Sequence, residues 1–580
     1  MHPPAHPLRS AIRLIAVLAL AALAPAAARA QKSGVRLTAT PAVRMTTAQI
    51  MAQPPAANSA AVSQARLHWE PEMPDRSALP QKPGAARASH WPVRISGATR
   101  TGLTGRRPRP LAPQSLGTSF TAANLYESRA IPPDCEGAIG PAQFVLFING
   151  VIRTFDKTTG AMDGVLDVQP DELFYPVMTR LENGVVINFT SDPQIRFDRL
   201  TARWFLTIID VPCKDISCTQ TAGNRVLLAV SDAASAGVIT NATVWTLFYF
   251  QSDPVNFCDY PSLGVDASAL YIGGNMFDAN LTQFLGTNAY VVNKASMLSG
   301  GPLIVTAFPG LVPSATSDGP SSPRGVDNFD PASNEGYFIG TSNLFLGSLV
   351  ARRVSDPGGT PTISPDIPIT VNATSPPIPV EHLGNTGGDN GRLDAIDDRV
   401  YSALIRKGRL WTAHNIGVDP TGVAGGTTGA GGTRRDAVRW YELNGIRSGD
   451  NGGVPTVVES GTIFDTSGTV SNARQFWMPS VMVSGQGHAA LGFSTAGTTY
   501  HADAATAGRL VDDPPGSTED VVIFTSSTTG YNPPGDPGST GARRWGDYSF
   551  TTLDPLDDMT MWTIQEYCNA TDTYGCRVVK

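Results

Sequence analysis

The sequence lacks several features that would assign it to a common class of protein. After residue 30 no run approaches the ~20 apolar residues of a membrane helix, so we expect no transmembrane segment. No Cys-x-x-Cys pair and no histidine cluster is present, which argues against a zinc site. There is no Gly-x-Ser-x-Gly elbow, so a serine-hydrolase triad has no support. No segment shows the period of an amphipathic helix, which leaves an all-β fold as the expectation.

The first 30 residues have the pattern of a signal peptide. Arg9 and Arg13 precede the apolar run Leu14–Leu23, and Ala28-Arg29-Ala30 forms a small-residue cleavage site. We predict cleavage after Ala30 and a secreted or periplasmic protein. The six cysteines suit such an oxidising compartment. The simplest pairing is Cys213–Cys218, Cys568–Cys576 and Cys135–Cys258, one of 15 connectivities open to six cysteines.

Charge divides the rest of the chain in two. Residues 31–125 hold 12 basic and 3 acidic residues, whereas residues 126–580 hold 28 basic and 47 acidic residues. The acidic body argues against nucleic acid as a partner. The basic arm is rich in Pro and Ala and buries little apolar surface, so we expect it to be mostly disordered. Segments near Trp91–Ile95 or Ser119–Leu125 remain candidates for docked strands.

From Tyr126 onward short β-branched and aromatic runs alternate with Gly, Pro, Asn and Asp turns. A unit recurs in which a turn leads into a strand, a polar turn follows, and a second apolar strand comes next. Its seven copies begin at Asp134, Ser191, Cys258, Gly325, Gly391, Trp477 and Arg543. Further strand-like runs between the units give four strands per repeat, which predicts a β-propeller over 126–580. We expect seven blades, with six as the alternative, and a strand upstream of Tyr126 that completes the last blade.

Four stretches carry a resemblance to a known family: 132–149, 191–204, 259–275 and 544–567. They resemble secreted bacterial β-propeller proteins of the sialidase-like superfamily, many of which have no assigned activity. Sialidases of that superfamily use three arginines for the substrate carboxylate, a Tyr–Glu nucleophile pair and an acidic Asp. Their Ser-x-Asp-x-Gly-x-x-Trp boxes are absent here in clean form, which weakens the implied glycosidase activity.

Propeller ligands usually bind where blade loops meet the central channel, so the turn residues beside the inner strands are the candidate site. These candidates are Asp134, Asp192, Asp259, Tyr260, Arg392, Arg544, Asp547 and Tyr548. Capping of turns is the plainer role for each Asp taken singly. No cofactor is expected. Ca²⁺ has weak candidates in oxygen-rich turns without EF-hand spacing, at Asp389, Asp394, Asp554, Asp557 and Asp558.

Three functions are compatible with these features. The first is an exported, monomeric binding or scaffold module with a ligand at the channel mouth, which a glycan would suit. The second is a sialidase-like glycoside hydrolase, and the third is an adhesion protein that uses the basic arm. A hydrolase would need three of Arg196, Arg324, Arg392 and Arg544 in one cavity, because a carboxylate needs converging guanidinium donors. We expect these arginines not to converge.

Overall fold

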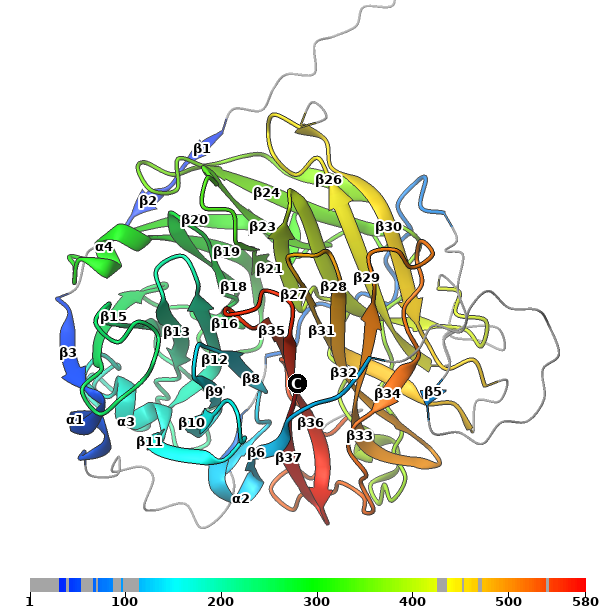
Figure 1. Ribbon diagram of the computed structural model, residues 1–580. Helices are drawn as coiled ribbons and strands as arrows, with labels where there is room; N and C mark the ends of the chain where they lie inside the picture. The colour runs from blue at the N-terminus through cyan, green and yellow to red at the C-terminus, as the bar shows by residue number, and fades with distance from the viewer. Residues whose placement is uncertain are drawn as a thin grey trace, which may run out of the picture.

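The computed structural model is an all-β ring of seven blades (Figure 1). It describes residues 31–37, 41–53, 66–68, 71–86, 95–96, 114–424, 435–450, 453–467, 472–538 and 542–580. The predicted signal peptide, residues 1–30, lies outside this part of the chain. The prediction of an all-β propeller with seven blades is confirmed.

The first four blades follow one another along the chain from inner to outer strand. Blade 1 holds β8 (Glu136–Ile139), β9 (Gln143–Ile148), β10 (Val151–Asp156) and β11 (Met162–Val168). Blade 2 holds β12 (Thr190–Asp198), β13 (Arg203–Asp210), β14 (Arg225–Ser231) and β15 (Val244–Gln251). Blade 3 holds β16 (Phe257–Asp259), β17 (Gly264–Val265), β18 (Ala269–Phe277), β19 (Phe284–Asn293) and β20 (Val305–Val312). Blade 4 holds β21 (Pro320–Gly325), β23 (Glu335–Ser342), β24 (Ser348–Ser355), β25 (Thr362–Ile363) and β26 (Ile367–Thr370).

The remaining three blades close the ring. Blade 5 holds β27 (Ser402–Arg406), β28 (Arg409–Val418), β29 (Arg435–Asn444) and β30 (Thr456–Ile463), with β22 (Asp327–Asn328) added in parallel to β27. Blade 6 holds β31 (Gln475–Val483), β32 (Ala489–Gly497), β33 (Tyr500–Arg509) and β34 (Val521–Ile523). Blade 7 holds β35 (Phe550–Leu553), β36 (Met561–Ala570) and β37 (Thr573–Val579).

The outer strand of blade 7 comes from the other end of the body. β6 (Ser119–Asn124) pairs antiparallel with β37, with Val579 opposite Ser119 and Gly575 opposite Asn124. Figure 1 shows this blue strand beside the red C-terminal strands. The prediction that an upstream strand completes the last blade is therefore confirmed. This pairing covers the outer edge of β37 and gives the last blade its fourth strand.

The core lies between neighbouring blades. Phe147 of blade 1 and Leu206 of blade 2 belong to one buried cluster that also contains Trp204 and Trp245. Five tryptophans of the blade strands are each at most 1% exposed: Trp204, Trp245, Trp440, Trp477 and Trp562. Because burying a large apolar side chain contributes roughly 1.5–3 kcal/mol, these contacts hold the blades together face to face.

Several described parts of the N-terminal arm pair with strands of the body. β1 (Lys32–Ser33), β2 (Val35–Arg36) and β3 (Val43–Thr46) add outer strands to blades 4, 3 and 2, and β5 (Ile95–Ser96) adds one to blade 6. β4 (Arg66–Leu67) pairs in parallel with β7 (Ala130–Ile131). These segments are too short to build a core of their own, so their order comes from backbone pairing with distant edge strands.

The few helices are short, and they are α1 (Thr47–Met51), α2 (Leu125–Ser128), α3 (Pro170–Phe174), α4 (Lys294–Leu298) and the 3-10 turn Gly388–Gly391. Among the described residues, none of the helices has the length and apolar character needed to cross a bilayer.

The cysteines pair differently from the expected pattern. The Cys213–Cys218 disulfide is present and confirms that prediction. Cys568 and Cys576 do not pair, because Cys576 lies opposite Glu566 and Cys568 opposite Tyr574 on adjacent strands. This diagonal offset separates Cα atoms by about 7–8 Å, beyond the usual reach of a disulfide. Cys135 and Cys258 are also unpaired with each other, since they sit on blades 1 and 3.

Candidate functional site

In six of the seven blades a non-glycine residue with positive φ stands at the start of the inner strand. These residues are Asp134 (φ 53°), Asp192 (62°), Tyr260 (54°), Ser322 (43°), Ile396 (55°) and Met478 (52°). In four of them the next residue is proline. The inner strands of blades 2, 4 and 6 shift register at this point, as at a β-bulge. Such a conformation costs about 1–3 kcal/mol per residue, and bulges redirect side chains, here around the mouth of the channel.

Five of the residues singled out from the sequence line one small cavity at this mouth. The cavity of about 70 Å³ is bordered by Asp134, Asp192, Asp259, Arg544 and Asp547. The backbone N–H of Asp547 donates to Asp134 Oδ1 (2.9 Å), and Arg544 Nη2 lies 2.6 Å from Asp547 Oδ2. The first of these contacts joins blade 7 to blade 1, whereas the second is local, so Asp134 connects two blades as well as lining the cavity.

Asp192 is the second carboxylate that connects different blades. Its Oδ2 accepts from the Tyr260 backbone N–H (3.0 Å) and from Tyr548 Oη (3.2 Å), and its Oδ1 accepts from Ser191 Oγ (2.8 Å). The Nδ1 atom of His68, from the N-terminal arm, lies 2.9 Å from Ser191 Oγ. Burial and the charges of Arg66 and Arg544 lower the pKa of His68 to about 3, so this imidazole is neutral.

Two tyrosines and an arginine stack beneath the mouth. Tyr260 and Tyr548 are parallel with ring centroids 4.5 Å apart, and the Arg399 guanidinium lies 4.2 Å from the Tyr260 centroid. Burial raises the pKa of both phenols above the usual value, so both stay protonated at any physiological pH. Both rings of the stack are buried, and neither borders the cavity.

Below the stack the channel is filled by paired charges. Arg196 lies 2.9 Å from Asp327 and 3.4 Å from Glu136, and Arg324 lies 3.9 Å from Glu136. Burial raises the pKa of Glu136 to about 7, although Arg196 and Arg324 oppose that rise. Gln194 completes the group by accepting from Arg324 Nη2 (3.0 Å). The inner channel is therefore a closed polar core.

The four arginines considered for a sialidase site lie in different surroundings. Arg196 and Arg324 face Glu136 deep in the channel, whereas Arg544 lies at the mouth. Arg392 is away from both, paired with Glu381 (2.6 Å) and Asp389 (2.8 Å), and its side chain is 35% exposed. Of the residues singled out from the sequence, Arg392 is thus the one that the fold leaves out of the mouth.

A segment of the N-terminal arm, residues 66–68 and 71–86, crosses the mouth; we call it the strap. It begins at β4, which pairs with β7 ahead of blade 1, and His68 reaches Ser191 of blade 2. At the far side the Lys82 backbone N–H donates to the Leu346 carbonyl of blade 4 (2.8 Å). No local sequence pattern indicates this crossing, because its contacts join residues far apart in the chain.

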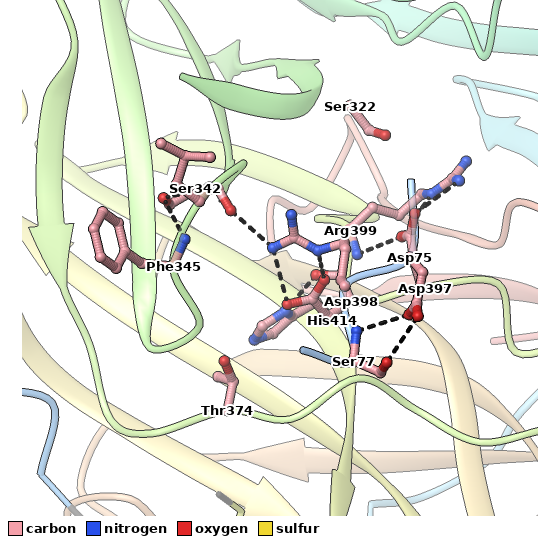
Figure 2. A network of polar contacts seen from close by, with 12 residues as sticks. Asp75, Ser77, Ser322, Ser342, Phe345, Thr374, Asp397, Asp398, Arg399 and His414 are labelled. Carbon is pink, nitrogen blue, oxygen red and sulfur yellow. Dashed lines mark hydrogen bonds and ion pairs between the residues drawn. The ribbon is translucent and has the colours of Figure 1, made fainter. Parts of the chain in front are cut away.

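Arg76 fastens the strap. Its Nε lies 2.5 Å from Asp398 Oδ1 and its Nη2 donates to the Ser342 carbonyl (2.8 Å). Both side chains of the ion pair are at most 5% exposed. Figure 2 shows the surrounding network, in which His414 Nδ1 contacts the Asp398 carbonyl (2.8 Å) and Arg399 pairs with Asp397 (2.9 Å). We call the contacts of Arg76 with Asp398 and Ser342 the clamp, and they join the strap to blades 5 and 4.

Strap and propeller together line an open cavity of about 770 Å³. Five carboxylates and three guanidiniums border it: Glu72, Asp75, Asp394, Asp397, Asp536, Arg76, Arg399 and Arg544. The rest of the wall is largely apolar and rich in proline, with Pro71, Pro74, Pro376, Pro377, Pro379 and Pro537. A concave, mostly apolar wall with a few polar groups is the usual form of a ligand site.

The carboxylates proposed for Ca²⁺ have other partners. Asp389 pairs with Arg392 (2.8 Å), Asp394 with Arg544 (3.5 Å), Asp554 with Lys157 (2.7 Å), Asp558 with Arg406 (2.7 Å), and Asp557 accepts from the backbone of Met559 and Thr560. Within the described ranges no three or more His, Cys, Asp or Glu side chains gather in a way that could hold a metal ion.

Comparison with known proteins gives likenesses to solved structures alone. No family model matches the chain, and no curated protein matches it. The parainfluenza virus 5 hemagglutinin-neuraminidase ectodomain aligns at 10% identity and TM-score 0.35, over 68% of this chain and 82% of that one. Trypanosoma rangeli sialidase aligns at 13% and 0.33, over 67% of this chain and 54% of that one. Penicillium chrysogenum α-L-arabinanase aligns at 12% and 0.32, over 67% and 98%. The structural neighbours of this seven-bladed propeller are thus sialidases and other glycoside hydrolases, at likenesses that leave its activity and ligand open.

Proposed function

We propose that the protein is an exported binding module that takes an uncharged or basic polar ligand, such as a neutral sugar, into the cavity between strap and propeller. The observation that carries this proposal is the cavity of about 770 Å³ at the channel mouth. Its size suits a small saccharide or a molecule of similar bulk, within the usual range of ligand pockets, ~300–1,000 Å³.

The chemistry of the wall favours this ligand class over an anion. Each of the three bordering guanidiniums already has a carboxylate partner: Arg76 has Asp398, Arg399 has Asp397 and Arg544 has Asp547. A ligand carboxylate would therefore compete with these pairs and meet a surplus of negative charge. Hydroxyl or ammonium groups would instead donate to Asp394, Asp397 or Asp536, while the proline rings contact the apolar face of a sugar.

Calorimetric titration tests the proposal with matched neutral, amino and sialylated oligosaccharides. We expect binding of a neutral or amino saccharide and none of its sialylated form. Asp394→Asn should weaken that binding at least tenfold, because a bordering acceptor loses its charge. Asp389→Asn is the matched control: this carboxylate lies five residues earlier, has a side chain that is 83% exposed and does not border the cavity. Tighter binding of the sialylated form, or no binding across the panel, would refute the proposal.

A glycoside hydrolase is the second candidate, favoured by the hydrogen bond from Tyr548 Oη to Asp192. A tyrosine beside a carboxylate resembles the nucleophile pair of sialidases, but burial raises the pKa of Tyr548 and holds its phenol protonated. We expect no release of 4-methylumbelliferone from sialoside or neutral glycoside conjugates. Turnover that Tyr548→Phe abolishes, with the fold intact, would make this protein an enzyme.

An adhesion role for the basic arm is weaker still. The described arm segments β1, β2 and β3 pair with this chain's own blades, and the strap lies across its own channel. These segments are therefore already occupied in the monomer.

A further inference from the structure

Two cysteines from distant parts of the chain meet where the ring closes. Cys135 lies just before β8 in blade 1, and Cys576 lies on β37 in blade 7. Their Sγ atoms are 2.7 Å apart, and both residues are 0% exposed. A disulfide holds its sulfurs about 2.0 Å apart, so a shift of less than 1 Å joins these two.

The neighbours of the pair leave no competing partner among the described cysteines. Cys568 Sγ contacts the carbonyls of Gly530 (3.5 Å) and Ala570 (3.3 Å). Cys258 lies in blade 3 beside Tyr290, and Cys213 and Cys218 are bonded to each other. Each of Cys135 and Cys576 therefore has one thiol within reach, and it is the other.

We propose that Cys135 and Cys576 form a disulfide that covalently closes the propeller between blades 1 and 7. The oxidant is a small or protein disulfide of an oxidising compartment. One cysteine thiolate attacks that disulfide, forms a mixed disulfide and releases one thiolate of the oxidant. The second cysteine thiolate then displaces the other half. The protein loses two protons and two electrons, and the oxidant disulfide becomes two thiols.

Burial of the two thiols determines when in folding the disulfide forms. It raises the pKa of both thiols, so neither forms the reactive thiolate readily once the blades are packed. The bond therefore forms while β37 is docking and the two thiols are still accessible to the oxidant. Afterwards the apolar cluster that contains Cys135, Cys576, Trp545 and Tyr574 shields it from reductants.

The bond would act on the site as well as on the ring. Closure of blade 7 otherwise depends on the backbone pairing of β6 with β37. Cys135 stands between Asp134, which accepts from the Asp547 N–H, and Glu136 of the inner channel. A covalent bond at this position keeps Asp134 and Asp547, on opposite sides of the seam, in register at the channel mouth.

Peptide mapping tests the bond directly. The protein is isolated from an oxidising compartment, or refolded with oxidised glutathione, then alkylated without reduction and cut with trypsin and chymotrypsin. Peptides 130–144 and 575–577 each contain one cysteine, and cleavage after Tyr574 separates Cys576 from Cys568 in 568–574. We expect these two peptides to be linked and Cys568 to be alkylated. Alkylated Cys135 and Cys576, or a link to 568–574, would overturn the proposal.

A thermal measurement gives an independent result. In a Cys213→Ala/Cys218→Ala background no other disulfide is present, so a reductant acts on this bond alone. Strong reductant during unfolding should lower Tm in that background and equally in the matched control Cys568→Ala. It should leave Tm unchanged after Cys135→Ala or Cys576→Ala. The proposed bond would be contradicted if the reductant lowered Tm equally in all variants, or if it did not lower Tm in the Cys568→Ala control. If the alanine variants do not fold, the peptide map alone tests the bond.

Discussion

Removing the Arg76 guanidinium should open the strap. Arg76→Ala leaves the Asp398 carboxylate buried, with its side chain 1% exposed and its ion-pair partner gone. Breaking a buried pair by removing one partner costs about 3–5 kcal/mol. The loss falls on the docking of the strap, because the strap can lift and let water reach Asp398. Since each 1.4 kcal/mol is a factor of ten, the opening equilibrium should rise roughly 100- to 4,000-fold.

Hydrogen exchange followed by mass spectrometry measures this opening. Amides of the strap should exchange faster by that factor, while those of β9 and β13 keep their wild-type rates. Lys82→Ala is the matched control, since it removes a strap cation whose contact is the Phe345 ring at 4.5 Å. Its effect should be below about 1 kcal/mol. Arg76→Met combined with Asp398→Asn removes both charges and should recover most of the protection. The proposed role of the clamp would be refuted if strap amides exchanged at the wild-type rate in Arg76→Ala. It would also be refuted if the double variant lost as much protection from exchange as the two single substitutions added together.

Three further predictions concern the channel and the arm. Tyr548→Phe removes the hydrogen bond to Asp192 and should lower the free energy of unfolding by about 1.5–3 kcal/mol in urea titrations, with no change meaning that the bond is not formed. The pKa of Glu136 is raised from 4.5 to about 7, so the folded state holds this proton and its stabilising effect is lost as pH rises from 4.5 to 7. In urea titrations the free energy of unfolding of the wild type should therefore fall by about 3 kcal/mol between pH 4.5 and 7. Glu136→Gln should remove most of this fall. The same dependence on pH in the variant as in the wild type would exclude the raised pKa. Deleting residues 31–46 uncovers the outer edges of β25, β20 and β15, so light scattering should show aggregation at lower temperature than in the wild type, and an unchanged onset would argue against the pairing.

The blades could be predicted from the sequence because their signal is local. Each strand is a short β-branched or aromatic run bounded by turn residues within fewer than a dozen positions, and the same unit recurs seven times. For the same reason Ser119–Leu125 was one of two segments of the arm named as candidates for docked strands. Val43–Thr46 was not, since its order depends on pairing with Val244–Leu247, some 200 residues away. So short a segment carries no pattern of its own to indicate this partner.

The candidate site shows the same difference between local and long-range signals. Asp134, Asp192, Asp259 and Asp547 were found because they occupy the repeated turn before an inner strand, and they meet at one cavity. Arg76 and Asp398 were missed because 322 positions separate them and nothing in either neighbourhood indicates the other. The cysteine pairing failed through register: the spacing of Cys568 and Cys576 fits a hairpin, but the offset of β36 and β37 places them diagonally.

The most direct test of the proposed binding site is a crystal structure of the protein with a neutral or amino saccharide that binds in calorimetry. We predict the ligand between the strap and the channel mouth, with hydroxyl or ammonium groups donating to Asp394, Asp397 or Asp536, and the Arg76–Asp398 pair intact. A ligand on the outer edges of the blades, or a ligand carboxylate held by Arg399 and Arg544, would contradict it.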